Sequence, residues 1–325
     1  MDQPIPIPGE IPAEIPKPEL EEPKNKMNVW IKSALSLALY LALGYFIFSR
    51  NWVFLLIVTA IIIFHELGHF IAMKIFKYND LGIFFIPLLG AYVSGTKQEV
   101  SQQQSAIILL AGPVPGIIVG TIFMLIPGNY NIMISETISL DEVGKAAILL
   151  NLLNLLPIFP LDGGQLIHRL FLDNSRIIGN IFLIASAGLL TWVAVSSGIY
   201  PLLIFPFMML TRMVRDMQND KIIAKIEGEG IDLVKSYDQL SAEEYWRIRN
   251  AVIKHYPQFR DVNPSPPYEI SPKEELIINV IQGLLQRTVI QDLSLAGKFL
   301  IMVIWVACFA APFLLDLSVR SSFRI

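Results

Sequence analysis

The motif HELGH, at His65 to His69, lies inside a strongly apolar stretch of the chain. The residues LLIVTAIIIF precede it and FIAM follow it, so the stretch is typical of a membrane-spanning helix. Ionisable side chains are costly at that depth and indicate a functional site. On a helix, His65 and His69 share one face and can reach a single metal ion, with Glu66 beside them. The pattern favours a zinc site suited to hydrolysis, and a hydrogen-bonded packing network within a buried helix is the alternative.

Composition extends the membrane assignment to most of the chain. Of its 325 residues, 54% are hydrophobic and 16% are charged, and the mean hydropathy is +0.54. We therefore predict an all-α polytopic membrane protein with six or seven transmembrane helices. The segments of spanning length lie at about residues 28–49, 52–76, 105–127, 145–161, 177–198, 199–214 and 297–316. The count stays open because residues 177–214 can hold either two spans or one span and an interfacial piece.

Four parts follow from the distribution of polar residues. Residues 1–27 form a Pro-rich arm that we expect to be disordered, and this arm lacks the apolar core of a signal peptide. Residues 28–215 form the transmembrane core, and residues 216–296 predict a small soluble helical domain. Residues 297–325 form a last transmembrane helix and a tail.

Charge indicates the partners and the orientation. The net charge of −3 and the lack of a broad basic face argue against nucleic acid as a partner, which leaves the lipid bilayer and other proteins. Lys and Arg gather after the second and sixth segments, so the positive-inside rule predicts a cytosolic N-terminus, a cytosolic opening of the site and a cytosolic domain at 216–296. The single cysteine, Cys308, cannot form an internal disulfide.

Residues 80–96 alternate apolar runs with Gly and Pro and are too short to span the membrane twice. They predict a short membrane-associated β-hairpin or sheet, with a plain interfacial loop as the alternative. Irregular backbone at membrane depth must be buried in protein or face a water-filled cavity. An open strand edge at this place could receive an extended peptide.

A second polar cluster supplies a candidate for the third metal ligand. A zinc hydrolase needs three protein ligands and one open position for water. Asp162, in NLLNLLPIFPLDGGQL, is a carboxylate within apolar sequence and beside flexible backbone. Pro157 and Pro160 predict an interrupted helix before it. Gly163 and Gly164 predict unusual backbone dihedrals directly after it.

HELGH followed by NLLPIFPLDGG resembles the site-2 protease family of intramembrane zinc metalloproteases, over about residues 52–170. The family pattern is HExxH with a later NxxP and LDG, which this chain matches at His65, Glu66, His69, Asn154, Pro157, Leu161, Asp162 and Gly163. The resemblance implies that His65, His69 and Asp162 bind Zn²⁺. It also implies that Glu66 is the general base and that Asn154 hydrogen-bonds the substrate near the scissile peptide.

The implied function is hydrolysis of peptide bonds within or near transmembrane segments of other membrane proteins. Residues 80–96 would then be the family's membrane-associated strands, where an unwound substrate pairs as an added strand. The chain departs from the family at GPVPG, where Gly116 stands at a position that often holds Asn. No PDZ-like insertion is visible between the motifs, so residues 216–296 are expected to serve a regulatory partner instead.

Two non-enzymatic functions compete with this interpretation. A membrane zinc transporter or a metal-dependent scaffold could use the same ligands. A transporter needs no general base beside its ligands, so Glu66 argues against it. A catalytically inactive scaffold that binds transmembrane partners is harder to exclude, although no residue of the expected site is missing.

Overall fold

The computed structural model describes residues 16–19, 28–47, 51–87, 90–97, 100–172, 175–264, 270–285 and 289–314. The chain divides into two compact units. The membrane unit comprises residues 27–210 and 289–325, and the polar unit comprises residues 1–26 and 211–288.

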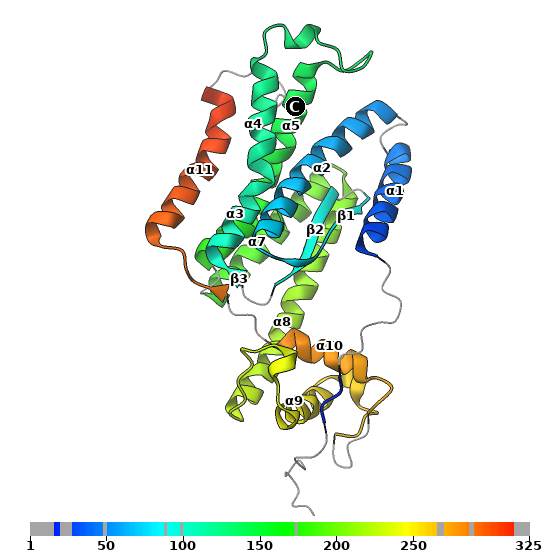
Figure 1. The fold of residues 1–325 in the computed structure, drawn as a ribbon, viewed down its shortest axis with the longest axis vertical. Coiled ribbons are helices and arrows are strands. Elements are labelled where there is room, and N and C mark those ends of the chain that lie inside the picture. Colours follow the sequence, from blue (N-terminus) through cyan, green and yellow to red (C-terminus); the bar gives the residue numbers. More distant parts are fainter. Residues whose placement is uncertain are drawn as a thin grey trace, which may run out of the picture. The chain divides into compact units, whose positions relative to one another are not determined.

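Long apolar helices dominate the membrane unit (Figure 1). Within the described residues, five helical stretches are long and apolar enough to cross a membrane. They belong to α1 (Val29–Ile47), α2 (Trp52–Ile75), α3 (Gln102–Ala111) continued by α4 (Pro113–Leu125), α7 (Arg176–Ser196) and α11 (Leu295–Leu314). This finding is consistent with a multi-pass membrane protein that is mostly helical.

The predicted count of six or seven spans stays a prediction. The segment expected at 145–161 is helical only as far as Asn154, in α5 (Leu140–Asn154). The segment expected at 199–214 forms η3 (Tyr200–Leu203) and the start of α8 (Ile204–Gly228), which continues into polar sequence. Gly198, with φ of +69°, lies at the break between α7 and η3.

Polar side chains cap the N-termini of three helices around the site. Asn51 accepts a hydrogen bond from the Phe54 backbone amide at the start of α2, and Ser101 accepts one from Gln104 at the start of α3. Ser139 and Glu142 form a reciprocal capping box at the start of α5. The caps satisfy amides that have no partner within their own helix.

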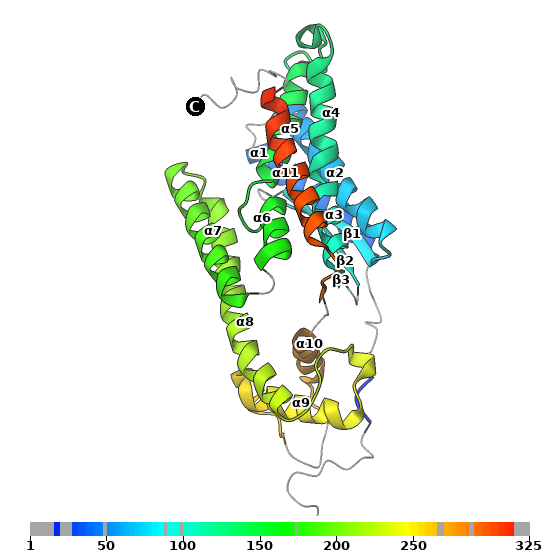
Figure 2. The ribbon, with the colours of Figure 1, turned by 90° about the vertical axis from the view of Figure 1, so that its left-hand side faces the viewer.

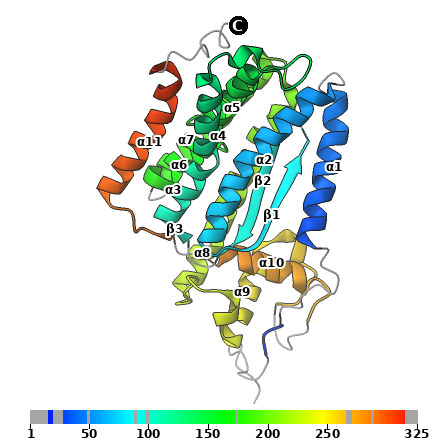
Figure 3. The same cartoon turned by 45° about the horizontal axis from the view of Figure 1, so that its top comes forward.

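The predicted hairpin over residues 80–96 is present as two antiparallel strands. β1 (Asn79–Ile86) pairs with β2 (Gly90–Thr96), with Ile83 opposite Val93. Figure 3 shows the hairpin beside α1 and α2, and both strands contact α2. The backbone amide of Phe85 donates to Ser36 Oγ on α1, at 3.1 Å, so α1 contacts the hairpin through β1. A shorter parallel pair joins β3 (Val100–Ser101) to β4 (Val289–Ile290).

Glycines let α4 and α5 lie side by side (Figure 1). A Cβ on Gly120 would lie 2.8 Å from the Gly144 carbonyl oxygen, and one on Gly144 would lie 3.0 Å from the Gly120 oxygen. Figure 2 shows α11 alongside these two helices. The core that they share is formed by Ala106, Leu110, Ile117, Ile148, Leu152, Leu155, Leu166, Leu170, Ile301 and Cys308.

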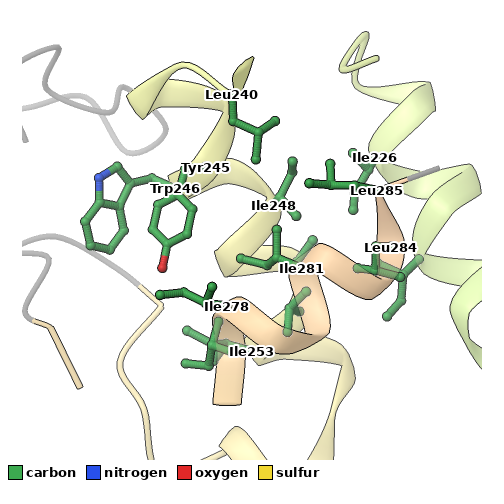
Figure 4. Packing of buried hydrophobic residues seen from close by; sticks show 14 of the residues in the cluster. Ile226, Leu240, Tyr245, Trp246, Ile248, Ile253, Ile278, Ile281, Leu284 and Leu285 are labelled. Carbon is green, nitrogen blue, oxygen red and sulfur yellow. The ribbon is translucent and has the colours of Figure 1, made fainter. Parts of the chain in front are cut away.

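The polar unit is helical. Two of its segments have apolar residues at helical spacing, and both fold as helices. SAEEYWRIRNAVIKHYP contains α9 (Ala242–His255), and EELIINVIQGLLQ contains α10 (Glu274–Leu284). Short turns η4 (Tyr237–Gln239) and η5 (Pro257–Phe259) precede and follow α9. Ile248 of α9 and Ile281 of α10 are fully buried in one apolar cluster, to which Ile226 of α8 also belongs (Figure 4).

A buried ion pair joins α9 to α10. Arg249 is 0% exposed and donates to both carboxylate oxygens of Glu274, at 2.7 and 2.9 Å. The Tyr245 hydroxyl donates to the same carboxylate at 2.5 Å. Burial by itself would raise the pKa of Glu274, but the hydrogen bonds from Arg249 and Tyr245 outweigh it and hold that pKa below its ordinary value.

We expect Glu274→Gln to destabilise the polar unit by about 3–5 kcal/mol, because the buried guanidinium of Arg249 loses its counter-charge. The lowered pKa means that the stabilisation by Glu274 is present above the unfolded-state pKa of about 4.3 and is lost as pH falls through the folded-state pKa. Hydrogen exchange of the α9 and α10 amides, compared between wild type and variant at each pH, measures both effects. Equal protection of the two proteins at neutral pH would contradict the expectation.

Candidate metal centre

Three metal-ligating side chains meet inside the membrane unit. His65 and His69 lie on α2, and Asp162 is the first residue of α6 (Asp162–Ile167). The Nε2 atoms of the two histidines are 3.0 Å apart, and Asp162 Oδ2 lies 3.1 Å from His65 Nε2 and 3.2 Å from His69 Nε2. The structure thus brings together the three residues that the sequence indicates as metal ligands.

Hydrogen bonds to the opposite ring nitrogens determine the tautomer of both histidines. His69 Nδ1 lies 2.7 Å from the Ile108 carbonyl oxygen, which can only accept, so this nitrogen carries the proton. The Asn151 amide nitrogen donates to the Ala147 carbonyl at 2.7 Å, which directs the Asn151 oxygen to His65 Nδ1 at 2.8 Å. His65 therefore donates from Nδ1 as well. In the neutral rings both Nε2 atoms then present a lone pair to the site.

The donor atoms fit a zinc ion. Asp162 Oδ2 is buried and, among the described residues, accepts no hydrogen bond. Two imidazole nitrogens and a carboxylate oxygen therefore converge at a buried place, an arrangement that favours a cation among them. Ligands bound to zinc at 2.0–2.1 Å in a tetrahedron are about 3.3–3.4 Å apart, close to the separations observed here. Two histidines and one carboxylate are also the ligand set of many catalytic zinc sites.

Glu66 completes the polar cluster on α2. Its side chain is buried, with 6% of the residue exposed, and it interacts electrostatically with His65, His69 and Asp162. A buried carboxylate beside three side chains that could bind a metal is compatible with the predicted general base, which stays a prediction.

The interrupted helix that positions Asp162 is present. α5 ends at Asn154 and α6 begins at Asp162, on either side of Pro157 and Pro160. Backbone groups freed by the break are satisfied by side chains, as irregular backbone within a membrane protein requires. Trp305 Nε1 donates to the Leu155 oxygen at 2.9 Å. The Phe159 amide donates to Ser186 Oγ at 3.2 Å, and Gln165 Nε2 donates to the Pro160 oxygen at 2.8 Å.

The predicted role of the two glycines after Asp162 is wrong. Gly163 and Gly164 lie within α6 and neither has a positive φ, so no unusual dihedral is needed. Glycine is required at both positions because other backbone segments approach them closely. A Cβ on Gly163 would lie 1.9 Å from the Leu155 oxygen, and one on Gly164 would lie 2.2 Å from the Ile158 carbonyl carbon. The interrupted segment can fold back against α6 only because these side chains are absent.

Asn154, the predicted substrate-binding residue, does not contact the three ligands in the described hydrogen bonds. It is the last residue of α5, and its amide nitrogen donates to the Leu150 oxygen at 3.2 Å. The asparagine that reaches a ligand is Asn151, which the sequence analysis missed. Its position in the sequence could have indicated it. Asn151 lies three residues before Asn154, so both amides lie at neighbouring positions on one face of the helix.

Two glycines, one in α2 and one at the junction of α3 and α4, shape the wall around His69. A Cβ on Gly112, between α3 and α4, would lie 2.3 Å from His69 Nε2. A Cβ on Gly68 would lie 1.9 Å from the Ala111 carbonyl oxygen. The histidine ring and the α2 backbone therefore approach α3 and α4 only because both positions lack a side chain.

Gly112→Ala is expected to lower zinc affinity by about 10- to 100-fold, because the added methyl group displaces the His69 ring. Gly188→Ala is the matched control, since Gly188 is also in an apolar helix but has open space around its Cβ position. Competition with a chromophoric chelator measures the zinc affinity of both variants and of wild type. Wild-type zinc affinity in Gly112→Ala would contradict the expectation.

Comparison with known proteins bears on the same region. The model of peptidase family M50 matches residues 53–138, which include HELGH. A curated zinc metalloprotease of Methanocaldococcus jannaschii is 25% identical over 140 residues, which are 41% of this chain and 40% of the relative, so the alignment spans two-fifths of that protein. A solved site-2 protease from the same organism is 20% identical and covers 55% of this chain and 84% of its own, with a TM-score of 0.40. The family match and the curated relative support the likeness to the site-2 protease family, peptidase family M50, that the two motifs indicate.

Proposed function

We propose that the chain is an intramembrane zinc metalloprotease that hydrolyses peptide bonds within or near transmembrane segments of other membrane proteins. The observation that carries the proposal is the convergence of three metal-ligating atoms, from His65, His69 and Asp162, beside the buried carboxylate of Glu66. The match to peptidase family M50 around HELGH supports the peptidase chemistry. The apolar helices around the site support a substrate that is itself in the membrane.

In this proposal, His65, His69 and Asp162 hold the ion, and Zn²⁺ with one carboxylate has a net charge of about +1. Zinc bound at this place would lower the pKa of a water molecule and polarise the substrate carbonyl. The Glu66 carboxylate accepts a proton from the attacking water and returns it to the leaving amine nitrogen. Asn151 and Ile108 keep Nδ1 of the two imidazoles protonated, so both Nε2 atoms stay available.

Asn154 is proposed to bind the substrate backbone near the scissile peptide. Its amide nitrogen lies at the C-terminal end of α5 and, among the described residues, donates to its own helix at 3.2 Å. A substrate carbonyl could replace the Leu150 oxygen as the acceptor at little cost, because one hydrogen bond is exchanged for another. A donor of this kind contributes a few kcal/mol where negative charge develops on the carbonyl oxygen.

The hairpin is proposed to receive the substrate as an added strand. A helical segment hides its carbonyl groups in internal hydrogen bonds, so the substrate must unwind before hydrolysis. Of the two outer edges, that of β1 is bound to α1 through Ser36. The outer edge of β2 is therefore the proposed acceptor, and main-chain hydrogen bonds would hold an extended peptide there.

Matched single-span substrates that differ only in helix-weakening residues test this proposal. Co-expressed with the protease, a weakened segment is expected to be cut at least about 10-fold faster than a stiff one, since unwinding costs less. Glu66→Gln serves as the control for cleavage by other proteases. Equal cleavage of stiff and weakened segments would contradict the requirement for unwinding.

The orientation and the regulatory role are also proposals. Lys74 in the last turn of α2 and Lys77 just after it, with Arg212 and Arg215 in α8, support a cytosolic N-terminus and a cytosolic opening of the site. The polar unit would then face the cytosol, where it could bind a regulatory partner. A zinc transporter or an inactive scaffold would share the ligands, but neither uses Glu66 as a base.

A further inference from the structure

A single amide side chain connects α5 to the proposed zinc site. Asn151 is 1% exposed and bonds both the Ala147 oxygen of its own helix and His65 Nδ1 on α2. Its amide lies against Gly116 of α4, where an added Cβ would be 2.1 Å from Asn151 Nδ2 and 2.8 Å from Oδ1. The amide thus fills the space that a side chain at position 116 would occupy.

We propose that Asn151 is a positioning residue for His65 and that Gly116 is required because it leaves room for the Asn151 amide. This proposal rests on the proposed zinc site. The Ala147 oxygen orients the amide, the Asn151 oxygen holds the proton on His65 Nδ1, and His65 Nε2 is thereby kept as a ligand. The effect of Gly116 passes through Asn151.

Asn151→Leu and Asn151→Asp test the hydrogen bond. The leucine variant removes the acceptor and is expected to bind zinc about 10- to 100-fold more weakly, whereas the aspartate variant keeps an oxygen acceptor and is expected to recover most of that loss. Affinity is measured by chelator competition on monodisperse protein. Equal zinc affinity of wild type and Asn151→Leu, or no recovery in Asn151→Asp, would overturn the role of Asn151.

Gly116→Ala and Gly120→Ala test whether Gly116 affects zinc affinity through Asn151. Gly120 lies one turn further along α4, and its Cβ would meet the Gly144 oxygen and Ile148 rather than Asn151. Both variants disturb the seam between α4 and α5, but only Gly116→Ala is expected to lower zinc affinity, by about 10-fold or more. Added to Asn151→Leu, Gly116→Ala should cause little further loss, because both changes act through one hydrogen bond. Equal losses in the two glycine variants, or additive losses in the double variant, would overturn the proposal.

These readouts are separate from the proposed protease function. Zinc affinity is measured without substrate, so a chain that binds zinc but cuts nothing would still test Asn151. If wild type and His65→Ala bind zinc equally weakly, the proposed metal site itself fails.

A different observation concerns the polar unit, where a piece of the N-terminal arm is bound. Lys17 Nζ donates to the backbone oxygens of Tyr237, Asp238 and Leu240 at 2.9, 3.0 and 2.7 Å. The ammonium group also lies 5.2 Å from the centre of the Tyr237 ring. All three donors of the lysine are therefore satisfied by backbone oxygens of η4 and of the residue that follows it.

The following proline is held as well. The Tyr237 hydroxyl donates to the Pro18 oxygen at 2.8 Å. Burial and the charges of Glu274 and Asp238 raise the pKa of Tyr237 to about 12, so the hydroxyl keeps the proton that it donates. The Tyr237 ring contacts Tyr245, which bonds the buried Glu274 carboxylate. The binding site is therefore built on the rigid core of the polar unit.

We infer that η4 and Tyr237 form a recognition site for an extended Lys-Pro peptide, which residues 16–19 occupy as an intramolecular ligand. A tethered ligand has an effective concentration of about millimolar, so it excludes competing peptides unless they bind tightly. The partner that fits the site is a Lys-Pro segment of another protein, presented in extended form. Displacement of the arm would be required for such a partner to bind.

A fluorescent peptide of residues 12–22 tests the inference on the full-length chain. Lys17→Gln in the protein should release the arm, so the peptide is expected to bind this variant at least about 10-fold more tightly than it binds wild type. A peptide with the same Lys17→Gln change is the control and is expected to bind neither protein. Tyr237→Phe, made together with the protein Lys17→Gln change, should weaken binding. The inference is overturned if Lys17→Gln protein binds neither peptide or binds both equally.

Discussion

Glu66→Gln is expected to reduce cleavage of a transmembrane substrate by about 100- to 10,000-fold while zinc remains bound. Glutamine keeps the shape of the side chain but cannot accept the proton of the attacking water. Glu66 directly follows His65, one of the proposed ligands, and is itself buried. Zinc affinity should change little, because Glu66 is not one of the three converging donors.

The measurement pairs cleavage of one co-expressed substrate with the zinc content of the purified variant. Glu243→Gln is the control, since this glutamate is 65% exposed on α9. Cleavage by Glu66→Gln at the wild-type rate would remove the proposed general base. Loss of zinc from Glu66→Gln would instead indicate that the carboxylate supports the metal.

Asp162→Asn is expected to abolish both cleavage and stable zinc binding. The Asp162 oxygen lies 3.1 and 3.2 Å from the two Nε2 atoms, and an amide in its place removes the one negative charge among the ligands. The loss of zinc affinity should exceed the roughly 10- to 100-fold typical of residues that only orient a ligand.

Asp216→Asn is the control for the aspartate change, because Asp216 lies on α8 with its side chain 51% exposed. Zinc affinity by chelator competition and secondary structure by circular dichroism are compared for both variants. An Asp162→Asn protein that is folded and binds zinc as wild type does would exclude Asp162 as a ligand. The two histidines would then need a different residue as the third metal ligand.

Features that depend on local spacing could be predicted from the sequence. The interval between His65 and His69 puts both rings on one face of a helix, and the structure has that helix as α2. The prolines before Asp162 predicted the interruption between α5 and α6. The Gly and Pro pattern of residues 80–96 predicted the hairpin, because turn-forming residues act over a few positions.

Features that depend on distant partners could not be predicted. Asn151 bonds a histidine 86 residues away in the chain, and no local pattern indicates which of two neighbouring asparagines reaches it. The glycines after Asp162 suggested free dihedrals, although their function is to admit the backbone of Leu155 and Ile158. Hydropathy also left the number of spans open, because α8 passes from apolar into polar sequence without a break.

The central claim is that water, activated beside His65, His69, Asp162 and Glu66, hydrolyses a peptide bond within a transmembrane segment. Reaction of purified protease and a single-span substrate in heavy-oxygen water, followed by mass spectrometry of the products, tests it most directly. We predict a cut inside the membrane segment, one heavy oxygen atom in the newly formed carboxylate, and neither product with Glu66→Gln. Products without heavy oxygen, cuts confined to the soluble parts of the substrate, or the same products from Glu66→Gln would contradict the claim.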